Sequence, residues 1–93
     1  DILYCEADGS YTNFYTADNK VYTTSNNLKK VESVLMQATF FRIHRSTLLN
    51  LKHVVQFNHT GELVLSNKKK LLVSSRNKTN FLRILKLMNY SIS

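Results

Sequence analysis

The sequence predicts a mainly β fold made of antiparallel sheets with two short helices. Short segments rich in β-branched and aromatic residues recur along the chain, several of them with the two-residue alternation of a strand. Turn-forming Asn, Asp, Ser and Lys residues separate these segments, because the chain has no proline and only two glycines. Only residues 28–35 and 75–88 repeat apolar side chains at helical spacing.

The strands are expected to form two meanders with a strand-and-turn unit between them. The turn Asp8-Gly9-Ser10 favours a hairpin in the first meander, since Gly9 can adopt positive φ. The central unit places the polar step His44-Arg45-Ser46 between two apolar runs. The expected strands are, in chain order, residues 2–7, 11–16, 20–24, 40–43, 48–51, 54–57, 62–66 and 70–74.

The two expected helices each have a recognisable start. Ser25 or Asn26 can cap the first helix, because a side-chain oxygen there accepts from free backbone N–H groups. Ser75-Arg76-Asn77 opens the second helix, whose apolar stripe is expected to dock onto the sheets. The stripes consist of Leu28, Val31 and Leu35 in the first helix and of Phe81, Ile84, Leu85 and Met88 in the second.

The charge of the chain is high and unevenly distributed. The 93 residues are enough for one domain, residues 1–93, and carry a net charge of +7. Residues 1–32 hold three lysines against five acids, whereas residues 33–93 hold ten basic residues and one acid, Glu62. This balance favours a polyanionic partner, nucleic acid first and an anionic membrane surface second. A basic face kept only for solubility is the alternative.

Several classes of protein are disfavoured by what the sequence lacks. No signal peptide is recognisable, and no apolar run approaches the roughly 20 residues of a membrane span. Cys5 is alone and is expected to be a buried hydrophobe, which fits a reducing cytoplasm. His44, His53 and His59 lack the spacing of zinc ligands, and His44 is expected instead to orient its turn. With no nucleophile motif or glycine-rich phosphate loop, we expect no enzyme, no metal and no cofactor.

Basic residues at turns are the remaining functional signal. Arg45 follows a buried strand, and an arginine can meet a phosphate or a guanine edge with two hydrogen bonds. Lys68-Lys69-Lys70 sits at an expected hairpin tip, which is also a common way to protect a sheet edge. Arg76 lies where the last helix begins, and free N–H groups at a helix start favour phosphate. The proposed phosphate clamp there consists of Ser74, Ser75, Asn77 and Lys78.

Three blocks of the sequence, in this order, resemble one known family. They are ILYCEADGSY at residues 2–11, FFRIHRSTLLN at residues 40–50 and Val73-Ser74-Ser75-Arg76-Asn77. This pattern resembles the LytTR family, the DNA-binding output domain of many bacterial response regulators. The resemblance covers nearly the whole chain and extends to Leu28, Lys29, Val31, Glu32, Leu35 and Gly61.

The resemblance implies a fold and a way of reading DNA. The fold is an elongated sandwich of antiparallel sheets, whose loops enter successive major grooves on one face of the duplex and usually bend it. The base-reading positions look like Tyr11, Arg45 and Arg76. Backbone contacts are implied for Ser46, Ser74, Asn77 and Lys78, and the charge pattern adds Lys68 and Lys69.

We therefore expect sequence-specific binding of double-stranded DNA by the output domain of a cytoplasmic bacterial transcription regulator. The resemblance also implies a dimer on paired sites and an upstream receiver or sensor domain, so that residues 1–93 are a fragment of a longer regulator. The alternative is a basic β-rich module that binds anionic lipid or an acidic protein surface. Only the basic segment and the Lys68–Lys70 tip support it, because no helix with a strongly basic polar face is evident.

Overall fold

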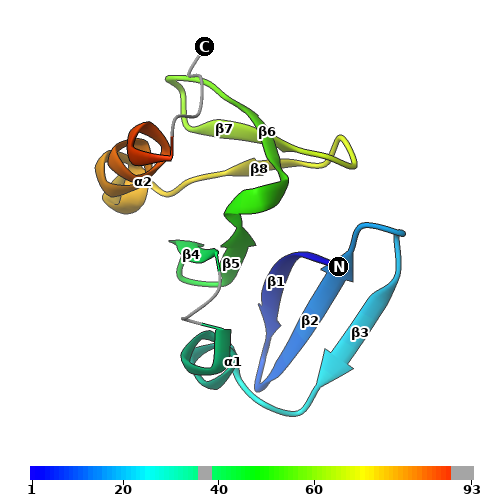
Figure 1. The fold of residues 1–93 in the computed structure, drawn as a ribbon. Helices are drawn as coiled ribbons and strands as arrows, with labels where there is room; N and C mark the ends of the chain where they lie inside the picture. The colour runs from blue at the N-terminus through cyan, green and yellow to red at the C-terminus, as the bar shows by residue number, and fades with distance from the viewer. Residues whose placement is uncertain (36–38, 89–93) are drawn as a thin grey trace.

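The computed structural model describes residues 1–35 and 39–88, which form two antiparallel sheets and two α-helices (Figure 1). The five-stranded sheet has the order β3-β2-β1-β5-β4, and the three-stranded sheet has the order β6-β7-β8. The predicted fold class is confirmed. The elements are β1 (Ile2–Asp8), β2 (Tyr11–Thr16), β3 (Val21–Thr24), α1 (Leu28–Leu35), β4 (Phe40–His44), β5 (Thr47–Asn50), the 3-10 helix η1 (Leu51–His53), β6 (Val54–Phe57), β7 (Glu62–Leu65), β8 (Lys70–Leu72) and α2 (Ser75–Leu87).

Both predicted meanders are present, and a non-local pairing enlarges the first. β1 pairs with β2 along the chain and with β5 from the central unit, so that Cys5 lies opposite Phe14 on one side and Leu48 on the other. The β1–β2 turn contains Gly9 at φ 61, the left-handed conformation expected there. The β4–β5 hairpin therefore becomes part of the first sheet.

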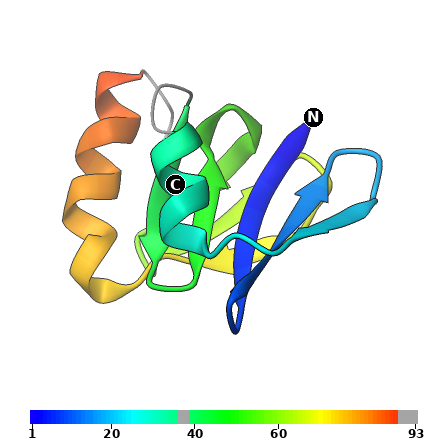
Figure 2. The ribbon, with the colours of Figure 1, turned by 90° about the horizontal axis from the view of Figure 1, so that it is seen from below.

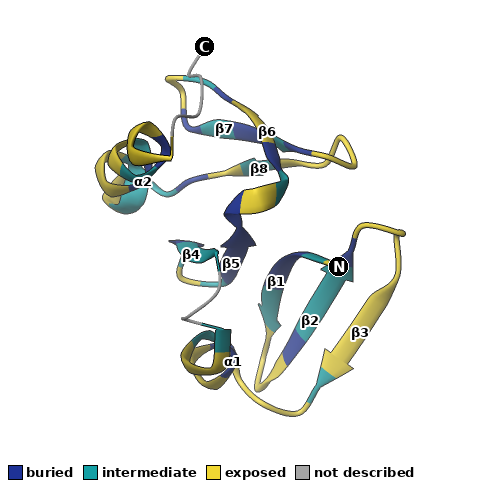
Figure 3. Cartoon of the chain, in the orientation of Figure 1, coloured by how far each residue is buried: buried dark blue, intermediate teal, exposed yellow. Residues whose placement is uncertain are grey.

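The first sheet is covered on both faces around β5. All four residues of β5 are buried, whereas the edge strand β3 is mostly exposed (Figure 3). Leu48 packs with Leu28 and Val31 of α1, whereas its neighbour Leu49 joins the larger core between the sheets. This alternation follows from the two-residue period of a strand. The larger core consists of Leu3, Tyr4, Ile43, Leu49, Leu51, Val54, Phe57, Leu63, Leu65, Val73, Phe81 and Leu85.

Helix α2 packs against both sheets through one aromatic side chain. The ring of Phe81 lies 4.9 Å from that of Phe57 in β6, edge to face, and 5.6 Å from that of Phe41 in β4. The two sheets meet at η1, where the buried Asn50 donates to the carbonyl oxygen of Ile2 at 2.8 Å and accepts from the Lys52 N–H at 3.1 Å. Helix α2 is thus packed against a strand of each sheet.

Neither residue predicted to cap α1, Ser25 or Asn26, is the cap. Asn27 is the cap, since its side-chain oxygen accepts from the N–H of Lys30 at 2.9 Å. Asn26 is instead held to the sheet, because its carbonyl oxygen accepts from the Thr12 hydroxyl at 2.9 Å. Asn26 and Asn27 are equally suited to capping as residue types, but the bond between Asn26 and Thr12 of β2 leaves Asn27 as the cap.

Several other boundaries differ from the prediction by one or two residues, and three of them affect how the elements connect. Leu51 begins η1 rather than ending β5, because the chain turns there toward the second sheet. Val73 and Ser74 lie beyond β8, and the N–H of Ser74 donates to the carbonyl oxygen of Ile43 at 2.9 Å. Met88 follows the last residue of α2 and stays 39% exposed, so the buried part of the α2 stripe ends at Leu85. Among the described residues, no helix is long and apolar enough to cross a membrane.

Candidate functional site

Three segments that are distant in the sequence lie along one edge of the molecule. They are the β1–β2 turn, the β4–β5 turn and the start of α2, and we call them the turn edge (Figure 2). The Ala7 N–H donates to the Ser46 carbonyl oxygen at 2.8 Å, which links the first two segments. The hydrogen bond from Ser74 to Ile43 links the third segment to β4. The turn edge therefore collects Tyr11, Arg45 and Arg76, the predicted base-reading residues, on one side of the domain.

Tyr11 lies at the first position of β2, opposite Asp8. Its side chain is 52% exposed, so the ring is available to a partner and is not a core residue. The exposed Asp8 beside it places a negative charge at the same turn. A partner that approaches Tyr11 would therefore meet a mixed polar surface at this turn.

The β4–β5 turn presents Arg45 to solvent and is held by its neighbours. The N–H of Ser46 donates to His44 Nδ1 at 3.3 Å, so Nδ1 is an acceptor and the ring proton lies on Nε2. The Ser46 hydroxyl lies 3.0 Å from the same nitrogen. His44 therefore orients the turn, as the sequence suggested, and Ser46 is half-buried beside the exposed Arg45.

Arg42 of the edge strand β4 also bonds to this turn. Its Nη1 donates to the Arg45 carbonyl oxygen at 2.6 Å, and its Nη2 lies 3.2 Å from Glu32 Oε1 on α1. The Nε–H is buried and has no hydrogen-bond acceptor among the described residues. A buried unpaired donor costs about 1–3 kcal/mol, so this arrangement stabilises the fold less than its two bonds suggest.

The start of α2 offers backbone N–H groups to an anion. The first N–H groups of any helix lack an intrahelical acceptor, and the dipole makes this end partly positive. Ser74 is the N-cap, but its side chain makes no capping hydrogen bond, and its carbonyl oxygen accepts from the N–H of Asn77 at 3.0 Å. Phosphate oxygens are the usual ligands of such a helix start.

A basic cleft of about 500 Å³ joins the second and third segments of the turn edge. Three arginines reach it, and none of the described residues that line it is acidic. Guanidinium groups form paired hydrogen bonds with phosphates and with guanine edges. The lining residues are Arg42, His44, Arg45, Ser74, Arg76 and Asn77, and we call this site the arginine cleft.

A second cleft, of about 410 Å³, lies between the two sheets. It brings Ser46 together with Lys69 and Lys70, but Glu6 and Glu62 line it too, so its charge is mixed. Lys69 thus lines this cleft and not the arginine cleft, and His44 is the one described residue that lines both clefts.

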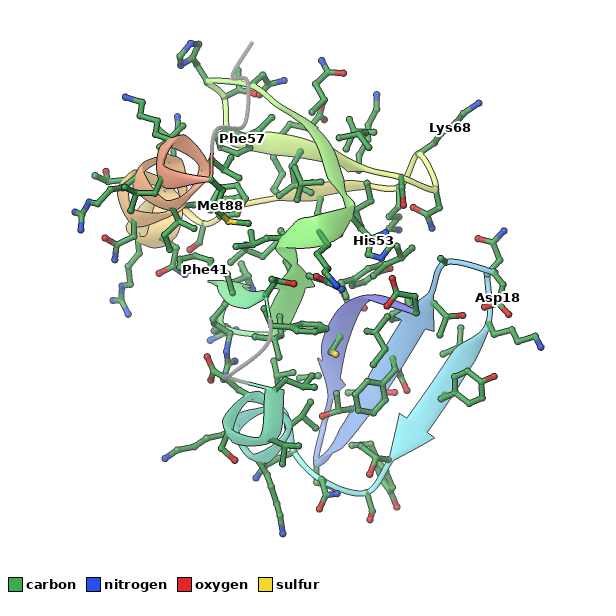
Figure 4. All side chains as sticks on the ribbon, viewed as in Figure 1. Asp18, Phe41, His53, Phe57, Lys68 and Met88 are labelled. Atoms are coloured by element: carbon green, nitrogen blue, oxygen red, sulfur yellow. The ribbon has the colours of Figure 1, made fainter. Side chains whose placement is uncertain are left out.

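Two of the predicted backbone-contact lysines lie outside both clefts. Lys68 projects into solvent at the β7–β8 turn with φ 72, well away from the turn edge (Figure 4). Lys78 is half-buried in the first turns of α2, after Asn77. Of the predicted backbone contacts, Ser74 and Asn77 therefore share the arginine cleft with Arg45 and Arg76, whereas the lysines do not.

Arg42 lines the candidate site, but the sequence analysis did not select it. It stands two residues before His44 in β4, and both line the arginine cleft. A usable signal was a basic residue in the strand that leads into the polar step, although the pairing of β4 with β5 is irregular between Arg42 and His44. The partner in α1, Glu32, could not be read from the sequence.

The described residues provide little for other chemistry. Within residues 1–35 and 39–88, no group of three or more His, Cys, Asp or Glu side chains could hold a metal ion. Cys5 is fully buried, and burial raises the pKa of its thiol to about 12, which leaves it uncharged and a poor nucleophile. The site is therefore suited to binding an anionic partner through arginines and backbone N–H groups.

A two-sheet domain with arginines on exposed turns and at a helix start has the features expected of a nucleic-acid-binding module. The family model of the LytTr DNA-binding domain matches residues 1–86, and the chain belongs to this family. The resemblance noted in the sequence is thereby confirmed. So is the prediction that the chain is not an enzyme, because the family is defined by DNA binding rather than by catalysis.

Relatives of known name agree with this membership. The sensory transduction protein LytT of Bacillus subtilis is 32% identical over 78 residues, which cover 80% of this chain and 32% of that protein. The transcriptional regulatory protein LytR of Staphylococcus aureus is 38% identical over 66 residues, or 67% of this chain and 26% of that protein. The chain thus spans between a quarter and a third of these relatives. A solved LytTr DNA-binding domain from Bacillus cereus superposes with a TM-score of 0.79 at 25% identity, covering 90% of this chain and 80% of that one.

Proposed function

We propose that this domain binds double-stranded DNA in a sequence-specific manner through the turn edge. The observation that carries the proposal is the arginine cleft, where Arg45 from a hairpin of the first sheet meets Arg76 from the start of α2. Both arginines are exposed. The hydrogen bond from the Ser74 N–H to the Ile43 carbonyl oxygen holds together the backbone segments that carry the two arginines.

Tyr11, Arg45 and Arg76 are the proposed base-reading residues. Because the turn edge spreads them over three segments, they would enter successive major grooves on one face of the duplex. A bidentate contact between arginine and guanine discriminates by about 1–3 kcal/mol against other bases. Tyr11 would add a contact at the groove beside the β1–β2 turn.

The proposed backbone contacts fall into two groups. Ser46, Ser74 and Asn77, which lie beside the arginines, would fix the register of the domain on the phosphates. Lysines would supply salt-dependent attraction that does not depend on sequence. Lys78 would act near the start of α2, and Lys68 and Lys69 would reach the backbone farther along a bent duplex.

We further propose that the domain is the output part of a longer bacterial transcription regulator. The names and lengths of LytT and LytR, of which the chain spans only a part, support this proposal. An upstream receiver or sensor domain would control binding, and two copies would occupy paired sites on DNA. Because bacterial DNA lies in the cytoplasm, the proposal also places the protein there.

The test is a selection of bound sequences from random duplexes, followed by fluorescence anisotropy titrations. The selected duplex and a scrambled control are each titrated at two salt concentrations. Sequence-specific binding predicts a recovered motif and an affinity at least about 10³-fold higher for the selected duplex. Equal and steeply salt-dependent binding to both duplexes would contradict the proposal. Vesicles of anionic lipid are the control for a merely basic surface.

A further inference from the structure

We propose that Arg42 is a positioning residue for base reading, which acts by holding the backbone of Arg45 against helix α1. This inference rests on the proposed function, because it assigns to Arg42 and Glu32 the task of aiming a base-reading side chain. Neither residue needs to touch DNA. The observation that supports it is that the guanidinium group of Arg42 donates both to the β4–β5 turn, at Arg45, and to helix α1, at Glu32.

The two hydrogen bonds of Arg42 use different nitrogens of one rigid group. Nη1 donates to the Arg45 carbonyl oxygen at 2.6 Å, and Nη2 donates to Glu32 Oε1 at 3.2 Å. A guanidinium group is planar, so fixing one end fixes the direction in which the other end donates. The carbonyl of Arg45 belongs to the same residue whose side chain is proposed to read a base.

The other end of this link is anchored. Glu32 lies in α1, and its neighbour Val31 packs with Leu28 and Leu48 in the core beneath the helix. The side chains of Arg42 and Glu32 are 26% and 39% exposed, so water screens their attraction only in part. The position of α1 is therefore transmitted to the β4–β5 turn through one ion pair.

A simple electrostatic role for Arg42 predicts different behaviour. Glu32 offsets the charge of Arg42, so the pair adds little net attraction for phosphate. If only charge mattered, removing the Glu32 carboxylate would strengthen binding to every duplex alike. If Arg42 positions the turn, replacing the carboxylate with a neutral amide weakens the charge-assisted hydrogen bond, which loosens the turn and reduces the preference for the selected duplex.

The experiment compares Glu32→Gln with Asp18→Asn in the titrations described above. Each substitution removes one negative charge, but Asp18 lies in the β2–β3 turn, at the opposite edge of the first sheet from β4 (Figure 4). We expect Glu32→Gln to lower the preference for the selected duplex about tenfold, within the range of one arginine–guanine contact. Asp18→Asn should leave that ratio unchanged. An unchanged ratio in Glu32→Gln would overturn the inference.

A second pair of variants keeps the positive charge. Arg42→Lys can bond to the Arg45 carbonyl oxygen or to Glu32, but a single ammonium group cannot reproduce the fork between them. Arg83→Lys, on the exposed side of α2, is the matched control. Arg42→Lys should lower the preference as Glu32→Gln does, with little change in the unfolding midpoint. Equal behaviour of the two lysine variants would count against positioning.

Measurements on the DNA-free domain separate this inference from the proposed function. Backbone ¹⁵N order parameters of Arg45 and Ser46 report motion of the turn on the ps–ns timescale. They should fall in Glu32→Gln and Arg42→Lys and stay unchanged in both controls. Unchanged order parameters would overturn the inference even if wild type binds a selected site. The order parameters could instead fall in both variants while wild type binds all duplexes equally. That result would refute the proposed function, and with it the role of Arg42 in base reading.

Discussion

Two turns of this domain carry basic residues at their tips, and they are held in different ways. The β4–β5 turn is bonded to two other elements, to β1 through Ala7 and to α1 through the Arg42–Glu32 pair. A further bond within its own hairpin joins Ser46 to His44. The hydrogen bonds of Asn67, Lys68 and Lys69, as far as the structure describes them, stay within the β7–β8 hairpin. At the base of this turn, the Ser66 N–H donates to the carbonyl oxygen of His53 in η1 at 2.8 Å. Lys68 points into solvent there (Figure 4).

This difference separates two uses of positive charge. A side chain whose backbone is bonded to several elements can present a directional donor at a constant place, which discrimination between bases requires. A lysine on an exposed tip contributes attraction that depends on distance and salt but little on geometry. The four predictions that follow are intended to break or sharpen this comparison.

The largest effect is expected from Phe81→Ala. Phe81 is fully buried and contacts rings from both sheets, so its truncation should cost about 3–5 kcal/mol of the free energy of unfolding. Because α2 would lose its anchor, Arg76 should lose its fixed relation to Arg45. Denaturant unfolding measures the cost. Leu87→Ala, at a 77% exposed position of the same helix, should change stability by less than about 0.5 kcal/mol.

Next in size is the effect of Arg45→Ala on selectivity. Loss of a bidentate base contact should reduce the preference for the selected duplex by about 1–3 kcal/mol and leave most non-specific affinity in place. Arg76→Ala should behave in the same way. Anisotropy titration with selected and scrambled duplexes provides the ratio. A variant as selective as wild type would show that the substituted arginine does not read bases.

A smaller and uniform effect is expected from Lys68→Ala. If Lys68 contacts one phosphate, affinity for both duplexes should fall equally, and the salt slope should decrease by about one unit. Titrations at several salt concentrations measure that slope. A change in the ratio of affinities would instead place Lys68 among the residues that read sequence, and the distinction between the two turns would fail.

The smallest effect concerns the pH dependence of the bond that anchors residues 66–69, the β7–β8 turn, which we call the lysine turn. His53 Nδ1 lies 3.1 Å from the Ser66 hydroxyl at the end of β7. Burial lowers the pKa of His53 from 6.5, with smaller contributions from the N-terminal amino group and Lys52. The nearby Asp1 carboxylate opposes this lowering, but it is 64% exposed, so water screens it. The folded state therefore binds this proton less readily than the unfolded state, and stability falls as pH drops below 6.5.

Unfolding midpoints at about pH 7.5 and about pH 5 measure this dependence, since the titration of histidine falls between them. The loss on acidification should be smaller in His53→Gln than in wild type. His59→Gln, at an exposed turn position, is the control and should lose as much as wild type. Selectivity for DNA should not change in either variant, because the lysine turn is proposed to act through charge alone.

Much of the fold and part of the site could be predicted from the sequence, because they depend on local patterns. Alternating side chains and turn residues located all eight strands to within a few residues. The distribution of charge indicated a polyanionic partner, and the three sequence blocks indicated the family. The individual roles of Tyr11, Arg45 and Arg76 remain predictions.

Only the tertiary structure decided which of these local pieces meet. The pairing of β1 with β5 brings the β1–β2 turn beside Arg45, and the packing of α2 brings Arg76 into the same cleft. The bond between Glu32 and Arg42 likewise joins residues from different elements. The capping of α1 by Asn27 goes with the bond that holds its neighbour Asn26 to Thr12 of the sheet. Local periodicity specifies which face of a strand is buried, but the packing of the complete core specifies what lies against it.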